Sequence, residues 1–350
     1  MDWRFLKKPV PWWGRLGVFI FALWYFDFLM PILSGDIFFH THMPGKSYSG
    51  AAEPLTADEA RIKDSLYEDV SMLTEKIGEG NMWHYEALQK RADYIKHRFK
   101  SCGYAVQSQT YELEGDKVEN ISAELKGSKL ETLIVGAHYD SVYGTAGAND
   151  NATGVAAVLT LACALRHATP ADTIRFVAFV NEEPPYFRTR NMGSLVYARQ
   201  CRQKNESIAG MISLETLGFY TDASHSQSYP FPLNYAYPDK GNFIGFAANN
   251  PSSDLLKSAI ASFRRNTHFP SEGGIVPSIL PGIGWSDHWS FWQAGYPAIM
   301  ITDTALFRYP FYHKKGDTID KISFAPYAKV VAGLSVMLLD MANHSSTVDH

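Results

Sequence analysis

Hydrophobic and polar positions along the chain predict alternating helices and strands from residue 57 onward. Apolar residues recur three and four positions apart over residues 57–101, a spacing that predicts helix, with Gly103 ending the stretch. Short alternating segments at residues 104–113 and 121–125 predict half-buried strands. The segment 154–166 is apolar nearly all round, which predicts a buried helix.

Four further runs are continuously apolar and lead into polar or charged residues: 132–137, 174–180, 210–214 and 298–302. Buried strands that alternate with helices are typical of a mainly parallel sheet covered on both faces. We therefore predict an α/β fold with three layers, α/β/α, around a central, mostly parallel mixed sheet. Ligand sites in such sheets lie at the carboxyl ends of the strands, where this chain has its ionisable residues.

The first 33 residues carry a different pattern. Basic residues precede an apolar run from Leu16 to Leu33 that only Asp27 interrupts, which is the length of a short membrane span. Positive charge before the span predicts a cytoplasmic N-terminus and a periplasmic or extracellular body. We expect residues 1–33 to form a signal anchor, one N-terminal transmembrane helix, with a cleaved signal peptide as the alternative. Residues 34–57 are expected to be a linker and residues 58–345 one catalytic domain.

Composition narrows the possible functions. The chain is 46% hydrophobic and 19% charged, so it can bury a sizeable core, and its mean hydropathy of −0.18 excludes a polytopic membrane protein. A formal charge of −4 gives no basic excess for a phosphate backbone, so we expect no nucleic-acid partner. The three cysteines lack the spacing of a zinc ribbon or disulfide scaffold, and Cys163 is expected to be a buried core thiol.

Seven side chains are candidates for catalysis and metal binding, of which three follow predicted strands directly and loops could bring the others to the same rim: His138, Asp140, Asp150, Glu182, Glu183, Glu215 and His313. Several carboxylates crowded at one dry rim repel one another, and bound divalent cations relieve that repulsion. Two histidines with several carboxylates and no cysteine fit catalytic zinc. A bridging carboxylate would hold two ions about 3.5–4 Å apart.

These residues stand in five short motifs that resemble the metal motifs of the M28 zinc peptidases. The motifs occur in family order: GAHYDS at 136–141, GANDNATG at 147–154, FVNEE at 179–183, LETLG at 214–218, and Tyr312-His313 with Asp317-Thr318. Ser286-Asp287-His288 also resembles a loop common near that active site. The likeness covers roughly residues 60–340. It implies the zinc exopeptidase-like version of the predicted fold.

The resemblance implies two zinc ions per chain. His138 and Glu215 would be terminal ligands of one ion, Glu183 and His313 of the other, and Asp150 would bridge them. Many family members have Asp where this chain has Glu215, whose longer arm still reaches a metal.

The resemblance also implies roles beyond the ligands. Glu182 would be the general base on a zinc-bridging water, Asp140 would orient His138, and Asp317 would do the same for His313. The Asp150–Asn151 peptide is expected to be cis. We also consider His288 as a donor to the oxyanion, against the alternative that it packs within the aromatic cluster 285–292.

The resulting prediction is a membrane-anchored two-zinc exopeptidase that acts on peptides, most simply an aminopeptidase. The alternatives are a single-zinc aminoacyltransferase like the glutaminyl cyclases, a carboxypeptidase of the same family, and a non-catalytic receptor-like ectodomain. Residues 219–292 are expected to line the substrate pocket. No pattern in the chain indicates the preferred side chain or the oligomeric state.

Overall fold

The computed structural model describes residues 41–278 and 280–344. The expected transmembrane segment, residues 1–33, and the first residues of the expected linker lie outside the described residues. The described residues from Met43 onward form one compact unit.

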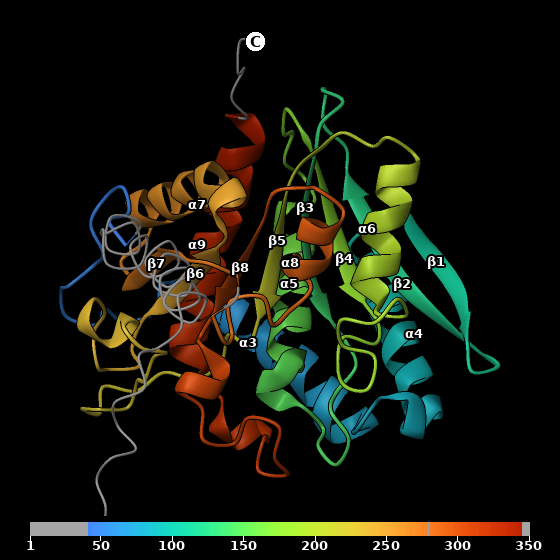
Figure 1. Cartoon of the computed structure of the whole chain (residues 1–350), viewed down its shortest axis with the longest axis horizontal. Helices are drawn as coiled ribbons and strands as arrows, with labels where there is room; N and C mark the ends of the chain where they lie inside the picture. The colour runs from blue at the N-terminus through green and yellow to red at the C-terminus, as the bar shows by residue number, and fades with distance from the viewer. Residues whose placement is uncertain (1–40, 279, 345–350) are drawn as a thin grey trace, which may run out of the picture. The chain divides into compact units, whose positions relative to one another are not determined.

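The centre of this unit is an eight-stranded mixed sheet in the order β1-β2-β4-β3-β5-β8-β6-β7 (Figure 1). The strands are β1 (Val106–Leu113), β2 (Asp116–Leu125), β3 (Thr132–His138), β4 (Thr173–Phe179), β5 (Ile208–Glu215), β6 (Ile244–Ala248), β7 (Ser271–Ile275) and β8 (Ala298–Thr302). Strands β4, β3, β5 and β8 are parallel neighbours, whereas β1, β2 and the β8–β6 pair add antiparallel connections. The predicted mixed sheet with a parallel centre is confirmed.

Helices cover both faces of the sheet, which confirms the three layers. The α-helices are α3 (Ala57–Ser71), α4 (Tyr85–Ser101), α5 (Gly154–Leu165), α6 (Gly193–Gln203), α7 (Ser253–Asn266), α8 (His288–Gln293) and α9 (Phe324–Asn343). The larger core cluster lies between the sheet and α3, α4, α5, α7 and α9, and the smaller cluster lies under α6 and α8 on the opposite face. The two clusters use alternate residues of the same strands, as the two-residue period of a strand requires.

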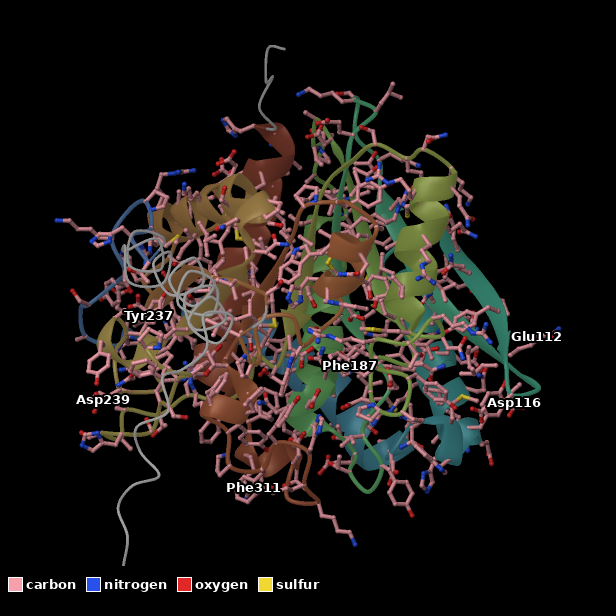
Figure 2. All side chains as sticks on the ribbon, viewed as in Figure 1. Glu112, Asp116, Phe187, Tyr237, Asp239 and Phe311 are labelled. Carbon is pink, nitrogen blue, oxygen red and sulfur yellow. A yellow bond between two sulfur atoms is a disulfide. The ribbon has the colours of Figure 1, made fainter. Side chains whose placement is uncertain are left out.

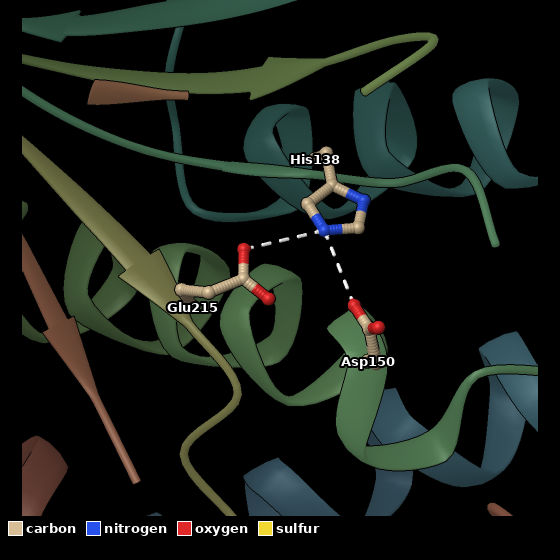
Figure 3. A group of neighbouring side chains, drawn as sticks. All are labelled: His138, Asp150 and Glu215. Atoms are coloured by element: carbon tan, nitrogen blue, oxygen red, sulfur yellow. Dashed lines mark ion pairs between the residues drawn. The ribbon is translucent and has the colours of Figure 1, made fainter. Parts of the chain in front are cut away.

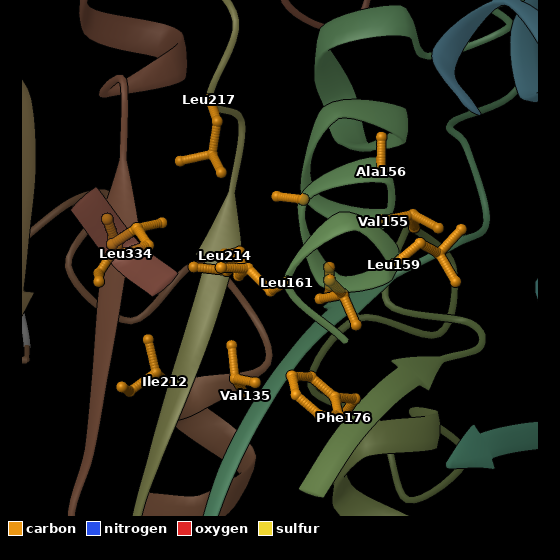
Figure 4. Packing of buried hydrophobic residues seen from close by; sticks show 14 of the residues in the cluster. Val135, Val155, Ala156, Leu159, Leu161, Phe176, Ile212, Leu214, Leu217 and Leu334 are labelled. Atoms are coloured by element: carbon orange, nitrogen blue, oxygen red, sulfur yellow. The ribbon is translucent and has the colours of Figure 1, made fainter. Parts of the chain in front are cut away.

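Helix α5 is buried because its residues are apolar on every side. Val155 and Leu159 are 1% exposed and pack in one cluster with Val135 of β3 and Leu214 of β5 (Figure 4). Burial of each such side chain contributes roughly 1.5–3 kcal/mol. This packing fixes the loop that precedes α5, residues 148–153, against the ends of β3 and β5.

The predicted helical stretch 57–101 is two α-helices rather than one. A π-helical turn, Met72–Ile77, follows α3, and Gly78 then adopts φ +90°, a conformation that glycine adopts without steric cost. The Asn81 side chain accepts hydrogen bonds from the backbone N–H groups of Trp83 and His84 and so starts the next helical segment. Gly103, at φ +89°, ends α4 as predicted.

The expectation of a free thiol at Cys163 is wrong, because Cys163 forms a disulfide with Cys102. The two residues are 61 positions apart, and only the packing of α4 on α5 brings them together. Cys201 is the buried free cysteine of the described residues.

Two terminal segments also belong to the core of this unit. Helix α9 is long and apolar enough to cross a membrane, yet Val331, Leu334 and Leu338 pack within the larger core cluster. Within the expected linker, Met43 packs against the same cluster. The Arg264 guanidinium donates hydrogen bonds to the carbonyls of Met43, Pro44 and Gly45.

Candidate active site

The carboxyl ends of three parallel strands carry the polar side chains that the sequence places there. His138 is the last residue of β3, Glu215 is the last residue of β5, and Glu182 and Glu183 follow β4. Asn181 has φ +58°, so the chain turns sharply after β4 and directs the two glutamates to the same rim. All four residues are buried.

Asp150 joins this rim from the loop before α5. His138 Nε2 lies 3.3 Å from Asp150 Oδ1 and 3.4 Å from Glu215 Oε2. Dashed lines in Figure 3 mark these two ion pairs. Ser286 donates a hydrogen bond to Glu215 Oε2 at 2.7 Å, which fixes that carboxylate. The Asp150–Asn151 peptide is cis, as predicted.

A second group of potential metal ligands surrounds the other carboxylate oxygen of Asp150. His313 Nε2 lies 2.9 Å from Asp150 Oδ2 and 3.3 Å from Glu183 Oε2. His313 comes from a loop after β8 and its side chain is 31% exposed, so this group faces solvent more than the first. The potential ligand atoms of each group lie within 4.8 Å of one another.

The two groups fit metal ions by their donor atoms. His138 Nε2, Asp150 Oδ2 and Glu183 Oε1 are buried and have no hydrogen-bond partner among the described residues. Buried polar atoms are normally hydrogen-bonded, so unpartnered atoms of this kind within the two groups fit the binding of cations. Imidazole nitrogens and carboxylate oxygens without thiolates are ligands of catalytic zinc.

The electrostatics of the rim indicate the same need for positive charge. Burial raises the pKa of Glu182 well above its usual value, and the neighbouring Glu183 and Glu215 carboxylates raise it further. Burial and the charge of Asp150 raise the pKa of Glu183 to about 7. Burial opposes protonation of His138, yet the carboxylates of Glu215 and Glu182 raise its pKa well above normal. Bound cations would offset this excess of negative charge.

Asp140 supports the site mainly through the backbone. Its carboxylate accepts hydrogen bonds from the N–H groups of Glu182 and Glu183 at 3.1 and 3.0 Å. His138 Nδ1 lies 3.2 Å from the Asp140 carbonyl oxygen and 3.7 Å from its carboxylate. Asp140 therefore positions the two glutamates, and its main chain is the nearer partner of His138.

Asp317 does not have the predicted role of orienting His313. Its carboxylate accepts hydrogen bonds from the N–H groups of Asn149 and Asp150 and from the Tyr309 hydroxyl, so it holds the Asp150 loop. The sequence places Asp317 four residues after His313, but only the fold brings it to residue 150.

Asn149 and Asp303 are supporting residues that the sequence analysis did not assign to the site. Asn149 donates to Asp303 Oδ2 and accepts from the N–H of Gly218. Asp303 follows β8 directly, and this position at a strand end is the feature of the sequence that could have assigned it to the site.

His288 is not placed to contact substrate, which corrects the hypothesis that it is an oxyanion donor. Its ring is fully buried, and Nε2 lies 2.7 Å from the Ile283 carbonyl oxygen. The ring packs edge-on against Trp292, with 4.6 Å between the ring centroids. Burial lowers its pKa to about 4, so it is neutral at physiological pH. Tyr312, stacked on His313 at 4.0 Å, lines the pocket instead.

A largely apolar pocket opens beside Glu215. Its walls come from the segments that follow β5, β7 and β8, and the lining includes Tyr229, Tyr237, Trp285, Phe307 and Tyr312. The expectation that residues 219–292 line the pocket is confirmed in part, since the lining within that range lies between Gln227 and Trp285, and residues 300–312 complete it. A pocket lined by aromatic and aliphatic side chains beside a metal centre suits an organic substrate.

Comparison with known proteins agrees with this geometry. The family model for peptidase family M28 matches residues 120–337. The Escherichia coli protein described as "Uncharacterized protein YfbL" is 36% identical over 284 residues, which cover 79% of this chain and 87% of that protein. A probable leucine aminopeptidase of Arthroderma otae is 24% identical over 231 residues. The match covers 61% of this chain and 55% of that protein, so the chain spans about half the length of this relative.

Solved structures share the fold at low sequence identity. The zinc aminopeptidase BSAP from Bacillus subtilis superposes with a TM-score of 0.66 at 15% identity, covering 81% of this chain and 96% of that chain. A glutaminyl cyclase from Fimbriiglobus ruber superposes with a TM-score of 0.58 at 19% identity, covering 84% and 98%. One fold therefore hosts both chemistries, and the fold alone does not distinguish them.

Proposed function

The chain belongs to peptidase family M28 and is a zinc-dependent, aminopeptidase-like peptidase, and on that premise we propose that it is a two-zinc aminopeptidase. The observation that carries the proposal is the shared aspartate. Asp150 contributes one carboxylate oxygen to the group with His138 and Glu215, and the other to the group with Glu183 and His313. A carboxylate with ligand groups on both sides is the arrangement that a two-metal site requires.

In this proposal the five residues of the two groups hold the metal, and Glu182 is the general base. Bound zinc would polarise the scissile carbonyl and favour ionisation of the attacking water. The Glu182 carboxylate is 3.9 Å from His138 Nε2, close to the proposed ligands but in neither group. It would take the proton of the water and deliver it to the leaving amine. The backbone hydrogen bonds to Asp140 hold Glu182 in place for both transfers.

The structure offers a second donor in place of His288. The Tyr312 ring stacks on His313, and the residue lines the pocket together with Glu215. Burial raises the pKa of its hydroxyl well above normal, and the nearby carboxylates raise it further, so the hydroxyl keeps its proton. We assign Tyr312 to donate a hydrogen bond to the carbonyl oxygen as negative charge develops there.

The proposal retains the predicted domain organisation and topology. Residues 1–33 would anchor the protein, and the domain 58–345 would lie outside the cytoplasm. The Cys102–Cys163 disulfide supports this location, because disulfides persist in oxidising compartments. Cysteine labelling of the intact membrane-bound protein from either side would test the topology.

A substrate panel with metal analysis tests the function. The full chain is reconstituted with Zn²⁺, its zinc content is measured, and hydrolysis is followed on free-amine, N-acetylated and C-terminally extended peptides. We expect two zinc ions per chain and release of N-terminal residues from free-amine peptides only. Release from the carboxyl end would show a carboxypeptidase instead.

The glutaminyl cyclase alternative gives a different result in the same assay. A single zinc ion with cyclisation of N-terminal glutamine, and no hydrolysis, would overturn the aminopeptidase proposal. If the zinc-loaded protein shows no hydrolysis and no cyclisation, the non-catalytic ectodomain is favoured.

A further inference from the structure

A single row of paired residues crosses four strands from the metal centre to the far end of the pocket. Glu215 of β5 pairs with Thr302 of β8, Thr302 pairs with Gly245 of β6, and Gly245 pairs with Glu272 of β7. Directly paired residues point to the same face of a sheet, and all four residues line the pocket. Neighbouring strands in a sheet lie about 4.8 Å apart, so the three steps from β5 to β7 separate Glu215 and Glu272 by roughly 14 Å along this row.

Between its two carboxylates the row carries only the side chain of Thr302. Gly245 has no side chain, and the neighbouring row on the same face also carries small residues, Ala247 and Gly274. The opposite face of these strands is filled, since Phe246 packs on Phe263 of α7. The pocket is therefore a hollow over β6 and β7 with Glu272 at its distal end.

The Glu272 carboxylate is partly buried and makes no hydrogen bond or ion pair with any described residue. Burial raises its pKa, and the charge of Arg264 opposes that shift. Arg264 does not pair with it, because its guanidinium donates to the carbonyl and hydroxyl oxygens of Ser271 and to the carbonyls of residues 43–45. A partly buried carboxylate without a partner leaves a place for an external cation.

Two tyrosine rings stand beside this carboxylate. Tyr229 and Tyr237 are stacked at 5.5 Å. Burial raises the pKa of both hydroxyls and the charge of Glu272 raises it further, while the charge of Arg308 opposes the shift at Tyr229. Their hydroxyls donate to the carbonyls of Pro238 and Gly273, so they do not satisfy Glu272. Aromatic faces next to a carboxylate attract cations.

Most of the pocket lining is apolar and includes Met300, Ala247, Leu233 and Phe307, with Thr302 as the polar residue next to Glu215 in the row. A long aliphatic stem packs against such walls while its charged head reaches Glu272. A long uncharged substrate side chain would bury the Glu272 carboxylate without a partner. An acidic substrate side chain would be repelled by the charge of Glu272.

We propose that this pocket selects substrates with a basic N-terminal residue, lysine or arginine, whose cation pairs with Glu272 beside Tyr229 and Tyr237. This inference rests on the proposed aminopeptidase function, because it places the side chain of the N-terminal residue in the pocket next to Glu215. It identifies Glu272 as the specificity-determining residue.

The test compares substrates of matched shape. Fluorogenic amides of lysine and norleucine, and of arginine and citrulline, differ mainly in charge. For the zinc-loaded wild type, we expect kcat/KM for each basic member to exceed its neutral partner roughly 10- to 100-fold, the range typical of a charge-assisted hydrogen bond. The variant Glu272→Gln should remove that preference and leave the norleucine rate within about twofold. Glu112→Gln, on exposed β1 at the other end of the sheet from Tyr237, is the control and should change nothing (Figure 2).

A binding measurement separates this inference from the proposed function. Lysine amide should raise the melting temperature of the wild type more than norleucine amide does, and the difference should vanish in Glu272→Gln. Equal rates and equal shifts for lysine and norleucine would overturn the assignment of the pocket, even if the enzyme is an aminopeptidase. Charge-dependent binding without hydrolysis of any free-amine peptide would instead support the pocket and overturn the proposed reaction.

Discussion

The Asp317 carboxylate accepts a hydrogen bond from the backbone N–H of Asp150 at 3.1 Å, across 167 positions of sequence. Its other oxygen accepts the N–H of Asn149 at 2.7 Å. Asp317 thus holds the main chain that presents the proposed bridging ligand. We predict that Asp317→Asn weakens zinc affinity about 10- to 100-fold, because an amide supplies one acceptor oxygen where two are used. Titration with a competing chelator measures the affinity. Asp320→Asn, an exposed neighbour, is the control.

The shared position of Asp150 predicts an unequal effect of ligand substitutions on metal content. Asp150→Ala should remove both zinc ions, whereas Glu183→Ala should remove one and leave the group with His138 and Glu215 loaded. Elemental analysis after dialysis against a fixed low zinc concentration reports the stoichiometry. Loss of one ion in both variants would show that Asp150 does not bridge.

Glu182 is expected to affect chemistry and not metal binding. We predict that Glu182→Gln lowers kcat about 10²- to 10⁴-fold with unchanged zinc content, since general acid–base catalysis contributes that much. Stopped assays and metal analysis on the same preparation check both quantities. Glu68→Gln, on the exposed side of α3, is the control. Wild-type turnover in Glu182→Gln would assign the base elsewhere.

The Cys102–Cys163 disulfide closes a loop of 61 positions, and constraint of such a loop in the unfolded chain stabilises the fold by roughly 4 kcal/mol. We predict that the double variant Cys102→Ala, Cys163→Ala melts at a lower temperature than the wild type. Dithiothreitol should lower the melting temperature of the wild type and leave that of the variant unchanged. The buried Cys201 is present in both proteins and controls for effects of the reductant on free thiols.

Arg91 is a buried cation that joins two loops to helix α4. The residue is 1% exposed, and its guanidinium donates hydrogen bonds to the carbonyls of Gly78, Tyr139 and Ala146. Arg91→Ala would leave these acceptors unpaired, each at a cost of about 1–3 kcal/mol, so we expect a loss of at least about 3 kcal/mol in the free energy of unfolding. Denaturant titration measures it. Arg61→Ala, whose side chain is 75% exposed, should change stability by less than about 0.5 kcal/mol.

Local sequence predicted much of the sheet because its central strands are buried on both faces. Continuous apolar runs such as residues 132–137 have no stable place outside a covered sheet, and the polar residue that follows each run marks the strand end. The metal-binding motifs were readable for the same reason, since His138 and Glu215 are the last residues of apolar strands.

The positions where prediction and structure differ depend on distant contacts. The sequence near Cys163 describes a buried apolar helix, and nothing local indicates that α4 ends beside it with Cys102. Asp317 lies close to His313 in sequence but close to Asp150 in space, and His288 lies in an aromatic segment whose packing turns its ring into the core.

The sequence by itself determined the type of fold, because burial and strand ends are local properties of a chain. Its motifs carried the resemblance that implied the family and the candidate ligand residues. The tertiary structure alone decided which residues share a row across β5, β8, β6 and β7. It thereby decided that Glu272, unremarkable in sequence, faces the same pocket as Glu215. Strand order and register are set by packing over the whole domain, so no local pattern encodes them.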